Sequence, residues 1–306
     1  MRHIPDQLDN LRQASAGQGP LYALMDGALA PELQAALIEH QPRLDYTPLF
    51  LGDEQGTLAA VSPYLVRFNS LDDNLMWWLL DEGQGKSWGI YLCSQAELTA
   101  LHHHLFCLLS VRNLEGEKLY FRYYDPRVLR PFWSALTEEE QNKFMGPIQT
   151  ILVENERAPG FGVYHRPKDM EQSPYPPPPE DWTELPEPWW EINQVQHEAL
   201  MGGVLRNFLY RFADYLSKTR DELRPDLKVD FYAEEYQEVL RKQTHYFMQH
   251  GFDTEKQLAE GLKYAQIFGL DLRNEQVRSV IENHSAEVAE RLDTMYWMAM
   301  LGIRHS

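Results

Sequence analysis

The sequence predicts an α/β N-terminal lobe, built as a mixed sheet layered with helices, and an all-α C-terminal lobe. Over the first half of the chain, short β-branched and aromatic runs alternate with stretches of helical spacing, which is the pattern of a layered α/β domain. A proline-rich segment follows, and beyond it apolar residues recur only at helical spacing. The expected divisions are a mobile N-terminal arm at 1–20, an α/β domain at 21–155, a Pro/Trp-rich connector at 156–191 and a helical lobe at 192–306.

The stretch 87–130 shows the alternation most clearly. Trp88–Cys93 is apolar and aromatic enough for a buried strand. Ser94 and Glu97 have the spacing of a capping box, and leucines at helical spacing after them predict a helix with one apolar face. Lys118–Tyr124 predicts a further strand, which ends at the following Asp-Pro pair because proline cannot donate to a ladder.

The remaining elements follow from similar local signals. Capping residues are expected at Asp72 or Asp73, and capping boxes at Thr137 with Glu140 and at Thr254 with Gln257. Other strands are expected at 21–25, 46–51, 59–68 and 148–153, and helices of the C-terminal lobe at about 192–224, 231–250, 254–268, 275–282 and 285–301.

Composition limits the classes of function. The 306 residues carry a formal net charge of -18, which disfavours nucleic acid and anionic lipid as partners. No run of about 20 apolar residues occurs, so no membrane insertion is expected. The first residues lack the apolar core of a secretion signal, and a cytoplasmic location is expected. Cys93 and Cys107 are expected to pack as small apolar residues rather than to form a disulfide.

Two polar clusters could carry chemistry. Three consecutive histidines begin at His102, but neighbouring helical residues point about 100° apart, so we expect no metal site, and no cofactor motif occurs. Asp125 follows a predicted strand beside Arg122 and Arg127, and with Trp88 these residues form an expected structural or partner-contact cluster. Two interpretations of Asp125 stay open: a carboxylate that orders its own turn and pairs with arginine, or a general base in a cleft.

The sequence of the α/β lobe also resembles a known family. The segment LYALMDGA at 21–28, the strand W-G-x-x-L-x-S, a helix with L-x-x-x-L and the segment F-R-Y-Y-D-P-R-V-L occur in the order found in the domain of unknown function 4123 family. Members of that family are adaptors, or chaperones, of the bacterial type VI secretion system, which load a toxic effector onto the VgrG spike. The resemblance implies a non-enzymatic adaptor whose partners are a cognate effector and the C-terminal region of the spike.

The aromatic residues of the connector and the helical lobe are the candidates for binding that effector. Most aromatic residues are expected in the core, and some in an exposed groove. The connector tryptophans are expected to tuck against a domain surface, the alternative being an exposed docking strip. The candidate effector-binding residues are Trp189, Trp190, Tyr232, Tyr236, Tyr246, Phe247, Tyr264 and Phe268. The alternative function is a hydrolase or transferase that uses Asp125, with Arg122 and a histidine such as His104.

Overall fold

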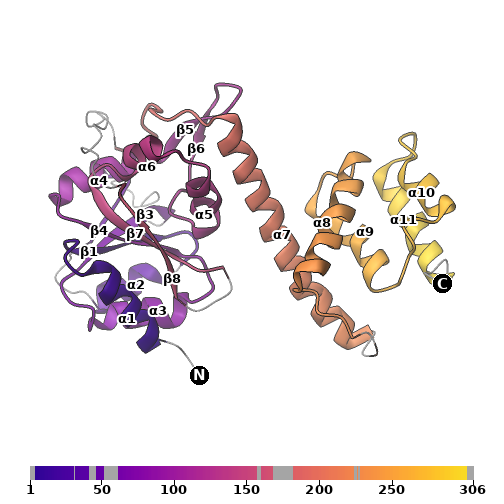
Figure 1. Ribbon diagram of the computed structural model, residues 1–306, viewed down its shortest axis with the longest axis horizontal. Helices are drawn as coiled ribbons and strands as arrows, with labels where there is room; N and C mark the ends of the chain where they lie inside the picture. Colours follow the sequence, from indigo (N-terminus) through magenta and orange to yellow (C-terminus); the bar gives the residue numbers. More distant parts are fainter. Residues whose placement is uncertain are drawn as a thin grey trace. The chain divides into compact units, whose positions relative to one another are not determined.

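A computed structural model of the chain describes residues 4–30, 32–40, 46–51, 61–156, 160–167, 182–223, 226 and 228–301 (Figure 1). The chain divides into two compact units, Met1–Gly203 and Val204–Ser306, called here the α/β unit and the helical unit. The division falls within helix α7 (Gln194–Leu223), about ten residues after the start of the expected helical lobe.

The α/β unit contains a six-stranded sheet in the order β2-β3-β1-β4-β7-β8, and every neighbouring pair is antiparallel. Its strands are β1 (Leu21–Asp26), β2 (Tyr46–Pro48), β3 (Pro63–Phe68), β4 (Gly89–Ser94), β7 (Ile148–Glu154) and β8 (Phe161–His165). A separate hairpin pairs β5 (Ser110–Arg112) with β6 (Lys118–Tyr120). The layered α/β class is confirmed, and the pairing of the large sheet is antiparallel rather than mixed.

Helices cover both faces of this sheet (Figure 1). One core lies under α1 (Ile4–Ser15), α2 (Leu33–His40) and α3 (Asn74–Gly83). The opposite core lies under α4 (Leu98–Cys107), α5 (Pro126–Ser134) and α6 (Glu138–Met145). Successive strand residues point to opposite faces, so β1 contributes Ala23 to the first core and Leu24 to the second.

The expectation of a mobile N-terminal arm is wrong for the described residues. Residues 4–15 form α1, and its Leu8 and Leu11 are buried against α3 and the sheet. Because two leucines three residues apart lie on one face of a helix, the segment has enough apolar surface to dock even though its other positions are polar.

Residues 182–192 also belong to the α/β unit. The amide of Arg112 donates to the carbonyl of Trp190, and the amide of Ile192 donates to the carbonyl of Arg112, at 2.9 Å each. Trp190 is buried, while Trp182 and Trp189 are half-buried against the same core. The prediction that the tryptophans tuck in is confirmed, and the expected connector is wrong where it is described, because β8 and these residues pack in the unit. The expected polyproline run at 173–179 lies outside the described residues.

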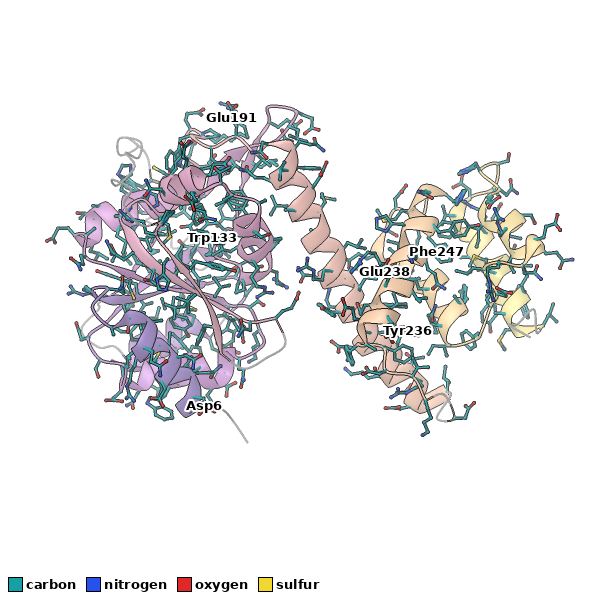
Figure 2. The ribbon with its side chains drawn as sticks, viewed as in Figure 1. Asp6, Trp133, Glu191, Tyr236, Glu238 and Phe247 are labelled. Atoms are coloured by element: carbon teal, nitrogen blue, oxygen red, sulfur yellow. The ribbon has the colours of Figure 1, made fainter. Side chains whose placement is uncertain are left out.

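The helical unit contains the second part of α7 with α8 (Glu234–Gln249), α9 (Glu255–Gln266), α10 (Glu275–Ile281) and α11 (Val288–Met300). These helices share one core, in which Phe247 of α8 is fully buried (Figure 2). Among the described residues after 192 no β-strand occurs, as predicted for an all-α lobe. Of the helices that the structure describes, none combines the length and apolar character needed to cross a membrane.

Candidate partner-contact site

The first part of the site is built at the start of α5. The expected strand at 118–124 ends at Tyr120, and the next four residues turn into the helix. Asp125 caps α5, because its Oδ1 accepts the backbone amide of Arg127 at 2.9 Å. The Arg127 side chain returns to the same carboxylate, with Nε 2.9 Å from Oδ1 and Nη2 2.6 Å from Oδ2. Asp125 therefore orders its own turn and clamps one arginine in a bidentate pair.

The second arginine has a different partner. Arg122 forms an ion pair with Asp26, at the end of β1. The other oxygen of Asp26 accepts the amides of Ala28 and Leu29 at 2.8 and 3.2 Å. The expected cluster of one aspartate between two arginines is thus wrong in one respect. Asp26, from a strand distant in the sequence, pairs with Arg122, and this pair lies beside the Arg127–Asp125 pair.

We define the arginine cluster as Asp26, Arg122, Asp125 and Arg127. Its acidic and basic side chains differ in their burial. The carboxylates are only 2% and 4% exposed, whereas the side chains of Arg122 and Arg127 are 38% and 40% exposed. Partial burial opposes the charge of Arg122, but attraction to Asp26 prevails and raises its pKa. The hydrogen bond to Asp125 raises the pKa of Arg127. The cluster is formally neutral, yet its solvent-facing groups are two fixed cations.

Two tyrosines adjoin the cluster. The hydroxyls of Tyr120 and Tyr124 lie 2.8 Å apart, and burial of the Tyr120 hydroxyl raises its pKa. The Tyr120 ring is nevertheless partly exposed, as is Leu119 beside it in β6. Apolar surface and two arginines therefore occur together at the end of the β5–β6 hairpin, which is a composition typical of protein interfaces.

Trp88 does not belong to this cluster. Its ring is buried in the core under α1–α3, 5.3 Å from the ring of Trp78, with the ammonium group of Lys86 4.7 Å from the ring centroid. Only its backbone reaches the site, because the amide of Asp26 donates to the Trp88 carbonyl at 2.8 Å. The Trp88 side chain is a packing residue.

The candidate residues of the connector are internal. Trp190 is buried, and its Nε1 donates to Gln196 at 3.2 Å. Lys143 lies 4.8 Å from the ring centroids of both Trp189 and Trp190 and donates to the Trp189 carbonyl at 3.0 Å. Burial lowers the pKa of Lys143. These contacts fix the segment to α6, so the pair is not a free docking strip.

Four of the six candidates in the helical unit hold its helices together. Phe247 is wholly core. Tyr232 donates its hydroxyl to Asp214, and Tyr236 donates to Gln266. Tyr246 donates to Glu282 at 2.9 Å. Each of these three hydroxyls bonds a residue outside α8, so we assign the tyrosines to packing between helices (Tyr236 is labelled in Figure 2).

The other two candidates belong to a line of rings on the outside of the helical unit. Tyr264 lies 6.3 Å from Phe268 and 5.9 Å from Tyr296, whose ring lies 5.4 Å from Trp297. The Lys263 ammonium is 5.8 Å from the ring centroids of both Tyr215 and Phe268, which links the line to α7. We call these five aromatic residues the aromatic surface: Tyr215, Tyr264, Phe268, Tyr296 and Trp297.

Three rings of the aromatic surface, Tyr215, Tyr296 and Trp297, are exposed, and Tyr264 and Phe268 are half-buried against the helical core. Trp297 is 62% exposed, and Met300 and Leu301 continue the exposed apolar stretch along α11. Next to Tyr215, a hollow of about 290 Å³ opens between α7 and α9, with Phe208 and Phe212 in its wall and the Arg211–Glu255 pair at its edge. Contiguous exposed apolar residues with a charged rim are typical of interaction sites.

The three histidines are packed individually. The Nε2 of His102 lies 2.9 Å from the Pro48 carbonyl oxygen, and that of His104 lies 2.8 Å from the Phe144 carbonyl oxygen. His103 packs near Trp182, with ring centroids 6.0 Å apart. Burial lowers the pKa of His102, and it lowers that of His104 to about 4. Over the described part of the chain, no group of three or more metal-ligating side chains converges.

Sequence reasoning missed Asp26 and Tyr120 as members of the site. The one signal that the sequence offers for Asp26 is an acidic residue that directly follows the apolar run of the first expected strand. Tyr120 lies within the expected strand Lys118–Tyr124, and β6 is exposed at every position, which the aromatic composition of that segment does not indicate.

The comparison with protein families matches part of the chain. Residues 21–143 match the model of the family described as Domain of unknown function (DUF4123). No curated protein matches the chain, and no solved structure matches it. The matched range begins with β1 and ends within α6, so it contains the whole arginine cluster and the β5–β6 hairpin. Residues 21–143 of this chain are therefore a domain of the DUF4123 family.

Proposed function

We propose that this protein is a non-enzymatic, cytoplasmic adaptor that binds a type VI secretion effector and loads it onto the VgrG spike. The DUF4123 domain supports this function because adaptors of that secretion system are the usual setting of the family. The observation that carries the proposal for this chain is the aromatic surface. A partly exposed line of rings from three helices is costly to keep in water unless a partner covers it.

In this proposal each of the two units binds a different partner. The helical unit lies outside the range matched by the family model, and we assign the selection of the effector to it. Its aromatic surface binds an apolar segment of the effector, and Trp297 is the residue that contributes most to this binding. The α/β unit, which carries the shared domain, takes the spike.

A hydrolase or transferase that uses Asp125 is the second candidate, and the geometry favours it less. Both oxygens of Asp125 accept hydrogen bonds from Arg127, and the same carboxylate caps α5. A general base needs a free oxygen within reach of the proton that it removes. Burial keeps His104 neutral near pH 7, but the Nε2 atom of this histidine is engaged with the Phe144 carbonyl.

The proposal expects the gene of this protein to lie beside a spike gene and an effector gene, and the test is co-purification of the full chain with those two products. Wild-type protein is expected to retain both. Trp297→Ala is expected to lose most of the effector and to keep the spike, because Trp297 is 62% exposed and its removal leaves the core intact. Trp77→Ala is the matched control, since Trp77 is a 40% exposed tryptophan on α3 of the other unit.

Two outcomes would contradict the proposal. A wild-type protein that retains neither gene product is not an adaptor for them. Equal retention of the effector by wild type, Trp297→Ala and Trp77→Ala would move the effector site away from the aromatic surface.

A further inference from the structure

The β5–β6 hairpin has one closed side and one open side. Its strands are joined through hydrogen-bonded pairs, because the Asn113 amide donates to the Glu117 carbonyl at 3.0 Å and the Phe121 amide donates to the Leu109 carbonyl at 2.7 Å. Since such pairs alternate along an antiparallel ladder, Val111 and Leu119 form the pair between them. The backbone groups of Lys118 and Tyr120 must then point away from β5.

The opposite side of the hairpin obeys the same alternation. Arg112 is the ladder partner of Lys118, and its amide and carbonyl point outward to Trp190 and Ile192 at 2.9 Å. The segment at 190–192 therefore closes the β5 side in a parallel bridge. On the β6 side, no hydrogen bond to the backbone of Lys118 or Tyr120 occurs within the described residues, and β6 has no second neighbouring strand there.

The side chains leave this edge accessible. Lysine on an edge strand commonly blocks pairing with another chain. Here the Lys118 ammonium is drawn to the Leu185 carbonyl at 2.7 Å and to Glu187 at 3.3 Å, on the segment that closes the other side. Leu119 and Tyr120 are both partly exposed apolar residues. An edge of this composition is suited to β-augmentation by an extended peptide.

The arginine cluster stands at the end of the same edge. Arg122 follows Tyr120 by two residues, and charge interactions link Tyr120 to both Asp26 and Arg122. The carboxylates of the cluster are buried, so a strand added along β6 would meet guanidinium groups rather than acids. The overall charge of -18 acts against an acidic partner only weakly at this distance, because physiological salt screens exposed charges beyond about 8 Å.

The geometry points to β6 as a strand-addition site for an extended segment of the spike protein that carries an Asp or Glu side chain. The segment pairs its backbone with the outward groups of Lys118 and Tyr120. Its carboxylate contacts the exposed faces of Arg122 and Arg127. This inference rests on the proposed function, because it takes the spike as the partner of the α/β unit.

Hydrogen exchange read by NMR on the full-length protein provides the most direct test. The probe is a set of overlapping synthetic peptides from the C-terminal region of the neighbouring spike gene product. A binding peptide should slow exchange of the Lys118 and Tyr120 amides at least tenfold. The Leu119 amide is an internal control, since it is already bonded to β5. Unchanged exchange at Lys118 and Tyr120 with a peptide that binds would overturn the inference.

Substitutions test the backbone pairing along β6 and the contact of the peptide carboxylate with the arginines separately. Lys118→Pro removes an outward amide without removing a ladder bond, and is expected to weaken peptide binding about threefold to tenfold relative to Lys118→Ala. Arg122→Gln is expected to weaken binding by about tenfold or more. Arg112→Gln is the matched control, because Arg112 is 37% exposed on the same hairpin but faces Glu187.

Peptide changes keep the test valid if a protein variant folds poorly. Replacing Asp and Glu by Asn and Gln in the peptide should reproduce the effect of Arg122→Gln, and equal affinity of the acidic and amide peptides would overturn the role of the arginines. The full spike protein separates the two proposals. If wild type retains the spike but Lys118→Pro and Arg122→Gln retain it equally, the β6 site is wrong and the adaptor function stands. If wild type does not retain the spike, the proposed function itself fails.

Discussion

Asp26 and Arg122 lie 96 residues apart in the sequence, and their ion pair joins the end of β1 to the segment that leads into α5. Asp26 is buried at the sheet, while Arg122 reaches solvent. The pair therefore fixes a solvent-facing cation to the buried end of an inner strand of the sheet. The arrangement costs little entropy on binding, because the arginine is already held in place.

Asp26→Asn should destabilise the protein by about 1–2 kcal/mol. The amide oxygen can still accept the Ala28 and Leu29 amides, but the charge that holds Arg122 is lost. Urea unfolding measures the change. Asp72→Asn is the control, because Asp72 is an exposed partner of Arg12 and its loss should matter by less than about 0.5 kcal/mol. Equal free energies of unfolding for wild type and Asp26→Asn would contradict a structural role for the Asp26–Arg122 pair.

Asp125→Ala should lower the free energy of unfolding by about 2 kcal/mol, because the variant loses the cap of α5 and both contacts to Arg127. The change should appear as a lower Tm in a thermal melt. An unchanged Tm together with lost activity on a small substrate would instead support the hydrolase or transferase interpretation of Asp125.

His104 should make stability depend on pH between about 6.5 and 4. Burial lowers its pKa to about 4 in the folded protein, whereas the unfolded chain takes up the proton near 6.5. Between pH 6.5 and 4 the unfolded state binds more protons than the folded state. The contribution of neutral His104 to the free energy of unfolding is therefore complete above pH 6.5 and is lost as pH falls toward 4. The loss is roughly 3 kcal/mol.

The His104 contribution is isolated by comparison with a variant that cannot titrate. Urea midpoints of wild type and His104→Gln, measured from pH 7 to pH 4, should differ in slope, with the steeper fall in wild type. Parallel curves would show that His104 does not carry the effect. The His104 ring packs directly against Gly146, in the space that a Cβ at residue 146 would occupy.

The two thiols should resist alkylation in the folded protein. Burial raises the pKa of Cys93 to about 11 and that of Cys107 to about 12, so little thiolate exists at pH 8. Mass spectrometry after iodoacetamide treatment should find both unmodified under native conditions and both modified in urea. Rapid modification of either thiol in the folded protein would contradict its burial.

Local signals in the sequence predicted elements well because the bonds that define them are local. Thr137 with Glu140 and Thr254 with Gln257 form the expected capping boxes, and Asp73 caps α3. The Ser94–Glu97 box failed for a non-local reason. The Ser94 hydroxyl donates to the Pro147 carbonyl at 2.8 Å, 53 residues away, and α4 begins without a side-chain cap.

Tertiary contacts also decided the parts of the site that sequence reasoning placed wrongly. No spacing in the sequence indicates that Asp26 rather than Asp125 takes Arg122, because strand order brings them together. Likewise, Tyr232, Tyr236 and Tyr246 have the same spacing whether they face a partner protein or neighbouring helices, and their hydroxyl partners lie in other segments.

The mass of the complex formed by the full chain with both neighbouring gene products tests the central claim most directly. Size-exclusion chromatography with light scattering on the three purified proteins should give one species that contains the spike, this protein and the effector. Trp297→Ala should give a complex that contains the spike but lacks the effector. Separate elution of the wild-type protein from both the spike and the effector would contradict the adaptor function.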